Sequence, residues 1–579
     1  MVRVTRVGVW LTLATAALIV SLATLHRADR SVAATKAARA KHPPCRREIR
    51  LARLPGQWLD GPKFDSHGWH MAGVVRRDDG ASVWVDGEFG PVHDEVRKFS
   101  LRFSPDGQRL AYVARSGGRW QVVVDGRLGP EYDEIYEFSP EFSPDGRRFT
   151  YAARKGGKWQ VVVDGRSGPE YDEIREYGPQ FSSDSRRVFY VARTRAAWQV
   201  VVDGQPGPRY DGIGIFTRTG GRSDPVFSPD GRTVAYVACR GDKQLVVVDN
   251  KPGPEYGAVR EIAFSPDGRR VAYAAHESDR YRGRAVIDGQ PGPEYDWVGD
   301  IVFSPDGRRV AYLSYEQGNV YEDGYEDSMR MVVVDGQPGP KYADVGHVSF
   351  SPDGRRLAYI VGVYSGHGEA GRHVMDAGQF VVVDGEEGPQ YDRVSKPVSS
   401  PDGRSLAYVG WDGKATVIVD GHPGPDYDDI DQLHAFFDPE GRRIAYVGTT
   451  GHGESVVVDG QPGPEYDWVG KIVISPNGRR LAYTARKGHR WQTVVDGQPG
   501  PEYDSVENSV FSPDGRRTAY VASKGRKHLV VVDGRPGEDY SWIADGTPCF
   551  HEDGTLEFLA ARGDVFYRVF ARPNSKVVQ

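Results

Sequence analysis

The feature that most constrains the fold is a motif that returns along nearly the whole chain of 579 residues. It opens with Phe-Ser-Pro-Asp-Gly, passes through an apolar segment containing Ala-Tyr, and ends in Val-Val-Val-Asp-Gly followed by Gly-Pro-x-Tyr-Asp. The stretch from Phe103 to Asp133 carries it in full. Repeats of this length indicate stacked units, none of which buries its apolar face alone. Thirteen units, spaced 37 to 39 residues apart where no insertion intervenes, begin near Phe64, Phe103, Phe142, Phe181, Phe227, Phe264, Phe303, Phe350, Ser399, Phe437, Ile474, Phe511 and Phe550.

Each unit divides into four extended segments separated by turns. The Val-Val-Val run does not alternate between apolar and polar residues, so both of its faces must be buried. A four-stranded unit of about 40 residues that neighbours cover on both sides is a propeller blade. The sequence therefore predicts an all-β tandem propeller, with an open solenoid as the alternative. In the seventh unit the segments are Ile301–Phe303, Arg309–Leu313, Met331–Asp335 and a short edge segment that carries Tyr342 and Val345.

These residues resemble the WD-like (WD40-like) repeats of TolB-type propellers, which also show Phe-Ser-Pro-Asp-Gly followed by an apolar strand with Ala-Tyr. The resemblance extends from about residue 60 to 570. It implies the propeller fold but no single function, because such repeats occur in binding proteins, in propeller domains of peptidases and in some lyases. The Val-Val-Val-Asp-Gly-x-x-Gly-Pro-x-Tyr-Asp half departs from the TolB pattern, so the resemblance does not imply the partners of TolB.

The number of units predicts two rings, because most propellers have about four to eight blades. We expect a first propeller of about seven blades over residues 47–346, a second of about six over 347–572, and a tail at 573–579. Six blades followed by seven is the alternative. The last unit lacks its fourth segment. The stretch from Ile49 to Leu59 is expected to dock beside it as the missing strand.

The N-terminus carries an export signal. Arg3 and Arg6 precede the apolar run Val7 to Leu25, which predicts a signal peptide or membrane anchor over residues 1–34 and a linker over 35–46. The run has 19 residues, enough to span a bilayer if it is not cleaved. We expect an exported protein, periplasmic or at the cell surface, either released or anchored. Basic residues after the run favour the opposite orientation, with the body on the cytoplasmic side.

The chain has three cysteines, which permit one disulfide in an oxidising compartment. Cys45 stands at the entrance to the repeat region and Cys549 near its end, so these two are the expected pair. Cys239 replaces a strand residue. Three free thiols are the alternative.

The recurring aspartates and tyrosines are assigned to structure, because a residue needed in every unit serves what every unit shares. Asp and Gly belong to turns, Tyr to packing between blades, and the arginines after Asp-Gly to strand starts with their charges in water. Insertions into the repeat are better candidates for function. Candidate binding residues lie in three such insertions: Arg218 and Arg222; Tyr315, Glu316, Tyr321, Glu322, Asp323, Glu326 and Asp327; and His367 and His373.

No cofactor is expected, although the acidic second insertion gives a weak indication of calcium. Gly-x-Ser-x-Gly, Walker-type, Cys-x-x-Cys and His-Glu-x-x-His motifs are missing from the sequence. The net charge of -6 with interspersed signs excludes a nucleic-acid stripe. The sequence favours a non-enzymatic binding or scaffold protein of the cell envelope with a protein or glycan partner, meeting the membrane only through its N-terminal segment. The alternatives are a lyase or hydrolase with an axial site and a tethered cytoplasmic interaction platform.

Overall fold

The computed structural model of the protein divides into two units, Met1–Cys45 and Arg46–Gln579. It describes residues 46–53, 58–65, 70–137, 139–214, 224–277, 282–316, 329–363, 378–430, 436–544, 546–563 and 565–571, all of them in the second unit. No helix in these ranges is long and apolar enough to cross a membrane. The predicted signal or anchor at residues 1–34 lies outside them.

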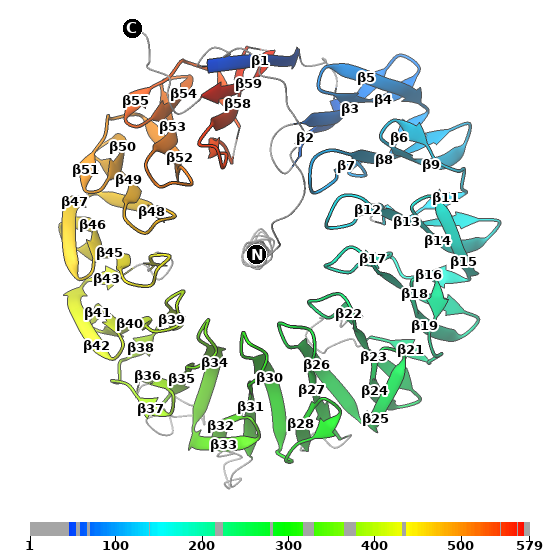
Figure 1. The fold of residues 1–579 in the computed structure, drawn as a ribbon, viewed down its shortest axis with the longest axis horizontal. Helices are drawn as coiled ribbons and strands as arrows, with labels where there is room; N and C mark the ends of the chain where they lie inside the picture. The colour runs from blue at the N-terminus through cyan, green and yellow to red at the C-terminus, as the bar shows by residue number, and fades with distance from the viewer. Residues whose placement is uncertain are drawn as a thin grey trace, which may run out of the picture. The chain divides into compact units, whose positions relative to one another are not determined.

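The described residues form thirteen antiparallel sheets, and each is a blade of four strand positions. We number the blades in chain order, beginning with the sheet of β2 to β5 and ending with the sheet of β58 and β59. Chain order runs from the inner side of the ring to the outer side within each blade, except that the outer strand of the last blade is β1 (Figure 1). This confirms the predicted all-β propeller blades.

The inner position is occupied by one strand or by two short ones in succession. These strands are β2 (Trp58–Phe64), β6 (Glu95–Val96), β7 (Arg102–Phe103), β11 (Glu134–Ile135), β12 (Glu141–Phe142), β16 (Glu173–Ile174), β17 (Gln180–Phe181), β21 (Gly212–Ile213), β22 (Val226–Phe227), β26 (Ala258–Phe264), β30 (Trp297–Phe303), β34 (Asp344–Phe350), β38 (Arg393–Val394), β39 (Val398–Ser399), β43 (Asp429–Ile430), β44 (Phe436–Phe437), β48 (Trp468–Ile474), β52 (Ser505–Phe511), β56 (Trp542–Ile543) and β57 (Cys549–Phe550).

The second position holds the Ala-Tyr strand: β3 (Met71–Arg77), β8 (Leu110–Ser116), β13 (Phe149–Lys155), β18 (Val188–Thr194), β23 (Val234–Arg240), β27 (Val271–His276), β31 (Val310–Glu316), β35 (Leu357–Gly362), β40 (Leu406–Asp412), β45 (Ile444–Thr450), β49 (Leu481–Lys487), β53 (Thr518–Lys524) and β58 (Leu556–Arg562).

The third position holds the valine run: β4 (Gly80–Val85), β9 (Arg119–Val124), β14 (Lys158–Val163), β19 (Ala197–Val202), β24 (Lys243–Val248), β28 (Gly283–Ile287), β32 (Met329–Val334), β36 (Gln379–Val383), β41 (Lys414–Val419), β46 (Gly453–Val458), β50 (Arg490–Val495), β54 (Lys527–Val532) and β59 (Val565–Ala571).

The fourth, outer position holds β5 (Glu88–His93), β10 (Arg127–Leu128), β15 (Arg166–Tyr171), β20 (Gln205–Pro206), β25 (Lys251–Tyr256), β29 (Gln290–Pro291), β33 (Gln337–Tyr342), β37 (Glu386–Glu387), β42 (His422–Tyr427), β47 (Gln461–Tyr466), β51 (Gln498–Pro499), β55 (Arg535–Pro536) and, in the last blade, β1 (Arg46–Arg53).

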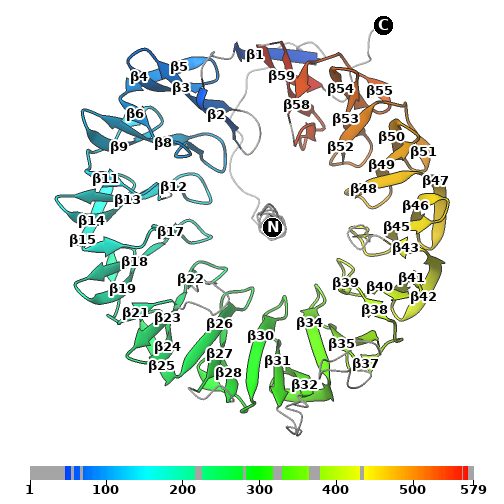
Figure 2. The same cartoon turned by 180° about the vertical axis from the view of Figure 1, so that it is seen from behind.

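The blades follow one another around one ring, seen from its two faces in Figures 1 and 2. The structure does not show the predicted division into two rings. Across the expected boundary, Leu313 and Val332 of blade 7 share an apolar cluster with Val345 and Leu357 of blade 8. The valine strand β32 contributes Met331 and Val333 to a cluster with blade 6 and Val332 to the cluster with blade 8, so both of its faces are covered and blade 7 offers no free face at which one ring could end.

The ring is closed by its first strand. β1 pairs antiparallel with β59 and supplies the fourth strand of the last blade, as predicted. The expected bounds, Ile49 to Leu59, need correction, because the strand is Arg46–Arg53 and Trp58 already begins the inner strand of blade 1. Buried Met71 and Trp84 of blade 1 pack with Leu559 of blade 13, which completes the circle.

The Asp-Gly pairs form the tight hairpins that the sequence predicts. Asp125 and Gly126 both have positive φ angles, 52° and 74°, as a two-residue type I′ turn requires. The carboxylate of Asp125 also accepts a hydrogen bond from the backbone N–H of Leu110 at 3.0 Å. The aspartate of Ser-Pro-Asp-Gly works differently: Asp106 accepts from the Ser104 hydroxyl and from the backbone N–H of Gln108.

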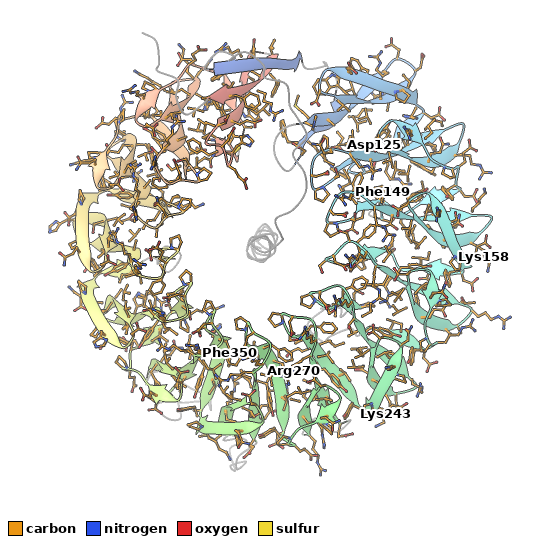
Figure 3. The ribbon with its side chains drawn as sticks, in the orientation of Figure 1. Asp125, Phe149, Lys158, Lys243, Arg270 and Phe350 are labelled. Carbon is orange, nitrogen blue, oxygen red and sulfur yellow. The ribbon has the colours of Figure 1, made fainter. Side chains whose placement is uncertain are left out.

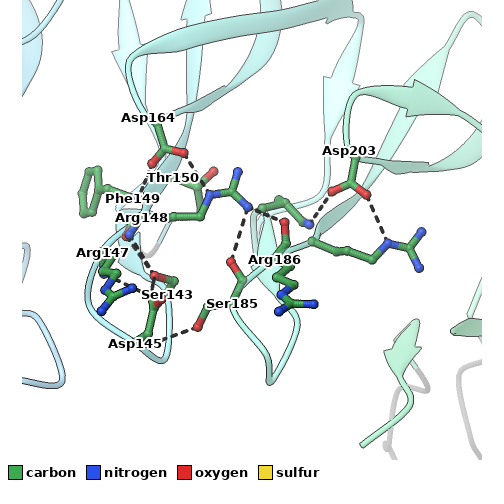
Figure 4. A network of polar contacts seen from close by, with 12 residues as sticks. Ser143, Asp145, Arg147, Arg148, Phe149, Thr150, Asp164, Ser185, Arg186 and Asp203 are labelled. Carbon is green, nitrogen blue, oxygen red and sulfur yellow. Dashed lines mark hydrogen bonds and ion pairs between the residues drawn. The ribbon is translucent and has the colours of Figure 1, made fainter. Parts of the chain in front are cut away.

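The second arginine after Asp-Gly ties blades together, which differs from the expectation that its charge lies in water. Arg148 donates to Asp164 of its own blade at 2.9 Å and to the Arg186 carbonyl of the next blade at 2.5 Å (Figure 4). Its guanidinium also lies 5.4 Å from the Phe181 ring. The side chain of Arg270, equivalent in blade 6, lies toward the inner side of the ring, whereas Lys158 and Lys243 lie outside (Figure 3).

The expected edge segment of each unit also needs correction. Gln337–Tyr342 is itself the edge strand in blade 7, and Val345 already belongs to the inner strand of blade 8. Tyrosines of the Pro-x-Tyr segment are buried in most blades because they meet the Ala-Tyr ring of the following blade. Tyr132, for example, is 1% exposed and contacts Tyr151 edge-on, with ring centroids 5.9 Å apart.

Candidate functional site

Three consecutive inner strands carry an irregularity that many other blades lack. β26, β30 and β34 are continuous but bulged, and the residue at each bulge has a left-handed backbone: φ is 50° at Glu261, 50° at Asp300 and 56° at His347. Such a conformation in a residue other than glycine costs on the order of 1–3 kcal/mol and often marks a functional position. The bulges place a carboxylate, a carboxylate and an imidazole in a row on the inner side of the ring.

A cavity of about 970 Å³ lies along this row. It runs beside the inner strands of blades 6, 7 and 8, and Glu261, Asp300 and His347 all line it. Trp297 lines it as well, with its indole stacked on the Tyr315 ring at 6.0 Å. Gly299 allows this arrangement, because a Cβ there would lie 2.5 Å from the indole of Trp297.

The ionisable side chains of the cavity wall differ in their pKa shifts and in their partners. Partial desolvation by the cavity wall raises the pKa of Glu261, and the neighbouring Asp300 adds to the effect. Its carboxylate accepts a long hydrogen bond, 3.4 Å, from the backbone N–H of Ile301 in the next blade. Partial desolvation and the charge of Lys396 lower the pKa of His347. Arg330 forms an ion pair with Asp344. The wall therefore carries two carboxylates beside a histidine that favours its neutral form.

One polar group in the cavity wall is buried. Ser314 is 1% exposed, and its hydroxyl has no hydrogen-bond partner among the described residues. The position one residue after Ala-Tyr-x elsewhere holds only small or apolar residues. They are Val75, Ala114, Ala153, Ala192, Ala238, Ala275, Val361, Gly410, Gly448, Ala485, Ala522 and Ala560.

The described ends of two predicted insertions meet at this cavity. β31 ends at Glu316 and β32 begins at Met329, while β35 ends at Gly362 and β36 begins at Gln379. Beside these ends, Tyr315, Arg330, Gly362 and Gln379 line the cavity. Glu316 forms an ion pair with Lys341, with Nζ and Oε2 2.5 Å apart. The other candidate residues lie outside the described residues: Arg218, Arg222, Tyr321, Glu322, Asp323, Glu326, Asp327, His367 and His373.

Sequence reasoning missed Glu261, Asp300, His347, Trp297 and Ser314. The available signal was a change of residue type at fixed positions of the repeat, namely three residues before Phe-Ser and one after Ala-Tyr-x. No residue is inserted or deleted at either position in blades 6, 7 and 8, so a search for insertions does not find them.

The predicted disulfide is not tested. Cys549 is a half-buried free thiol whose pKa is raised by burial and by the nearby Glu557, and Cys45 lies outside the described residues. Cys239 is also a free thiol. Within the described ranges no group of three or more His, Cys, Asp or Glu side chains could hold a metal ion. The acidic residues considered for calcium lie outside those ranges.

Four-stranded antiparallel blades around a ring define a β-propeller. No protein-family description matches the chain, and no curated protein does. Solved structures with a similar fold include the β-propeller domain of the Trilobed protease from Pyrococcus furiosus, 15% identical, covering 48% of this chain and 96% of that one with a TM-score of 0.23. TolB from Acinetobacter baumannii is 15% identical, with coverages of 48% and 79% and a TM-score of 0.19.

A structure of the eukaryotic initiation factor is 12% identical, covering 62% of this chain and 95% of that one with a TM-score of 0.27. The propeller fold that the resemblance to TolB-type repeats implies is confirmed by the thirteen blades themselves. At these scores, the likeness says nothing about activity or partners.

Proposed function

We propose that this propeller is a binding or scaffold protein of the cell envelope that holds a protein or glycan partner over blades 7 and 8. The observation that carries the proposal is a cavity of about 970 Å³ lined in part by residues that the repeat does not supply, with the ends of two insertions at its edge. Ligand sites in proteins are typically concave, with a few polar groups placed among apolar and aromatic ones. A rigid ring of blades is suited to present such a site.

Partner capture tests this proposal. The full chain and a variant with residues 317–328 replaced by a short Gly-Ser linker are used to capture proteins and glycans from envelope extracts. The matched control shortens residues 278–281, which lie in the corresponding connection of blade 6. We expect a partner that the control retains and the 317–328 variant loses. Identical partner sets for all three proteins would contradict a partner site at this insertion.

The envelope location rests on the N-terminal apolar run and has its own test. Protease treatment of intact cells should degrade the repeat region if it is exposed at the surface, and a periplasmic body should become accessible once the outer layer is permeabilised. Degradation only after lysis of the inner membrane would favour the tethered cytoplasmic platform instead.

An enzyme is the second candidate, because Glu261 has a raised pKa and His347 a lowered pKa in the same cavity. Two titratable groups shifted in opposite directions are a common arrangement for proton transfer. A lyase or hydrolase of this kind would lose turnover of a polysaccharide or peptide substrate in E261Q while still binding it. Binding without turnover by the unaltered protein would favour the scaffold.

A further inference from the structure

We infer that the cavity beside blades 6 to 8 binds a primary ammonium group. The inference deepens the proposed function, on which it rests, by naming the chemistry that the partner presents. Four features of the cavity wall support it: two carboxylates, a buried hydroxyl, an aromatic stack, and two basic side chains that do not offset the carboxylates.

The first feature is the pair of carboxylates. Glu261 and Asp300 occupy successive bulges and both line the cavity. Among the described residues no lysine, arginine or histidine nitrogen lies within ion-pair distance of either carboxylate; Glu261 accepts a backbone hydrogen bond from Ile301, and the more distant charge of Arg260 lowers its pKa. Partial desolvation raises the pKa of Glu261, and the charge of Asp300 adds to the effect. Two like charges with no cation between them are stabilised by a cation from outside.

The second feature is the Ser314 hydroxyl. A buried hydroxyl without a partner is unfavourable, and a bound donor relieves that cost. An ammonium group has three N–H donors and no acceptor, so it can serve two carboxylates and a hydroxyl together. The serine occurs where the other blades carry only Ala, Gly or Val, and that blade is the one bearing Asp300.

The third feature is aromatic. Trp297 and Tyr315 stack against one another and both line the cavity. A cation within about 6 Å of such a ring is attracted to its face, most strongly over tryptophan. Apolar chain next to the ammonium, as in a lysine side chain or an alkyl diamine, also finds contact on these rings and on Ile262, Ile301 and Val348 of the wall.

The fourth feature is the engagement of the basic residues. Arg330 is held by Asp344, and the lowered pKa of His347 favours the neutral imidazole. Neither side chain therefore neutralises Glu261 and Asp300. An anionic ligand would meet both carboxylates, which disfavour it.

The binding test uses two probes with the purified full chain in titration calorimetry: cadaverine, and an N-acetylated peptide with one central lysine. Their neutral counterparts are 1,5-pentanediol and the same peptide with acetyl-lysine. The site variants are D300N and S314A. Asparagine tolerates a positive φ, as Asn508 shows with 55° at the equivalent bulge of blade 12. N508A is the matched control.

We expect an amine probe to bind, D300N to weaken binding about tenfold, S314A about fivefold, and N508A to leave it unchanged. Binding of the peptide alone would assign the ammonium to a partner protein, and binding of cadaverine alone to a small amine. Equal binding of the neutral counterparts, or no effect of D300N in a variant with unchanged thermal unfolding, would overturn the inference. If neither amine binds at millimolar concentration while partner capture still requires residues 317–328, this inference fails and the proposed function stands.

Discussion

Blades 2 to 4 and blades 6 to 8 follow the same repeat but fill the space behind their inner strands differently. In blades 2 to 4 the second residue of the third strand is a tryptophan, opposite the Pro-x-Tyr tyrosine: Trp120, Trp159 and Trp198. In blades 6 to 8 that position holds Gly283, Arg330 and Gln379. Arg330 and Gln379 line the cavity.

The inner strands differ to match. In blades 2 to 4 the inner position holds two short strands, and this segment is two residues longer than the one that forms the continuous inner strand of blades 6 to 8. The added length lets a side chain reach the tryptophan: Tyr136 stacks on Trp159 at 3.8 Å, and the guanidinium of Arg97 lies 4.1 Å from the Trp120 ring. The cavity therefore exists because three neighbouring blades lack both a large ring and the longer segment that covers it.

The largest expected effect is on stability in blades 2 to 4, where tryptophans fill the space behind the inner strands. W159A should lower the free energy of unfolding by about 3–5 kcal/mol, since Trp159 is 7% exposed and its removal leaves a void beneath Tyr136. W297A, on the cavity side, should cost clearly less because its indole is half-buried. Urea unfolding combined with hydrogen exchange of the affected blade measures both. Equal losses would remove the distinction between filled and open blades.

The next largest effect is expected when blades 7 and 8 are given the tryptophans of blades 2 to 4. The double variant R330W/Q379W places rings where blades 2 to 4 have them and should lower affinity for the partner or the amine by at least about tenfold through lost volume. Q244W, at the equivalent position of blade 5, is the control because Gln244 does not line the cavity. Undiminished binding by the double variant, with the fold intact, would place the site elsewhere.

A smaller effect is shared by both groups of blades and depends on acid. The Ser-Pro-Asp-Gly aspartates have lowered pKa values, chiefly through the serine hydroxyl and a backbone N–H. A carboxyl whose folded-state pKa is lowered contributes stability above its unfolded pKa, about 4, and loses it as the pH falls through the folded value. The melting temperature should therefore drop between about pH 4 and pH 2.

D306N tests this dependence in one blade of the cavity side. Blade 11 already carries Asn477, which accepts from Ser475 at 2.8 Å and from the Arg479 N–H at 3.1 Å, so the amide preserves the turn. The acid-induced drop in melting temperature should be smaller in D306N than in the unaltered protein. An unchanged drop would show that the turn aspartates do not carry the acid sensitivity.

The smallest effect has the opposite sign and comes from Glu261 on the cavity side. Because the pKa of Glu261 is raised, the folded protein binds its proton more tightly than the unfolded chain does, and stability falls as the pH rises through the interval above about 4.3. E261Q removes this contribution. Its melting temperature relative to the unaltered protein should increase from pH 4 to pH 7, and a constant difference would contradict the assignment.

The sequence was sufficient to predict the structure of each blade but not the number of blades in the ring. Non-alternating valines, Asp-Gly turns and the missing last strand each follow from local geometry, and each is present in the structure. The number of blades per ring depends instead on the angle between neighbouring sheets, which no periodicity encodes. The packing of tyrosines between blades was predicted, but the arginine contacts were missed for the same reason, since the bond from Arg148 to the Arg186 carbonyl spans two repeats.

The candidate site was found only at its edge. Tyr315 was recognised because an insertion follows it, and it does line the cavity. Ser314, Asp300 and Gln379 resemble ordinary variation within a strand, because their significance comes from neighbours in the adjacent blades. A comparison of repeat positions across the chain, and not only of repeat lengths, would have selected them.

The pairing of β1 with β59 has a consequence for how the molecule is made. The strand at Arg46–Arg53 pairs with residues around 565–571, so it is synthesised first and finds its partner last. Until then, the growing chain is an open arc with an unsatisfied edge at each end, and such edges recruit other strands. Completion of the circle therefore covers both edges with the chain's own residues, and a chain that stops before β59 leaves them exposed.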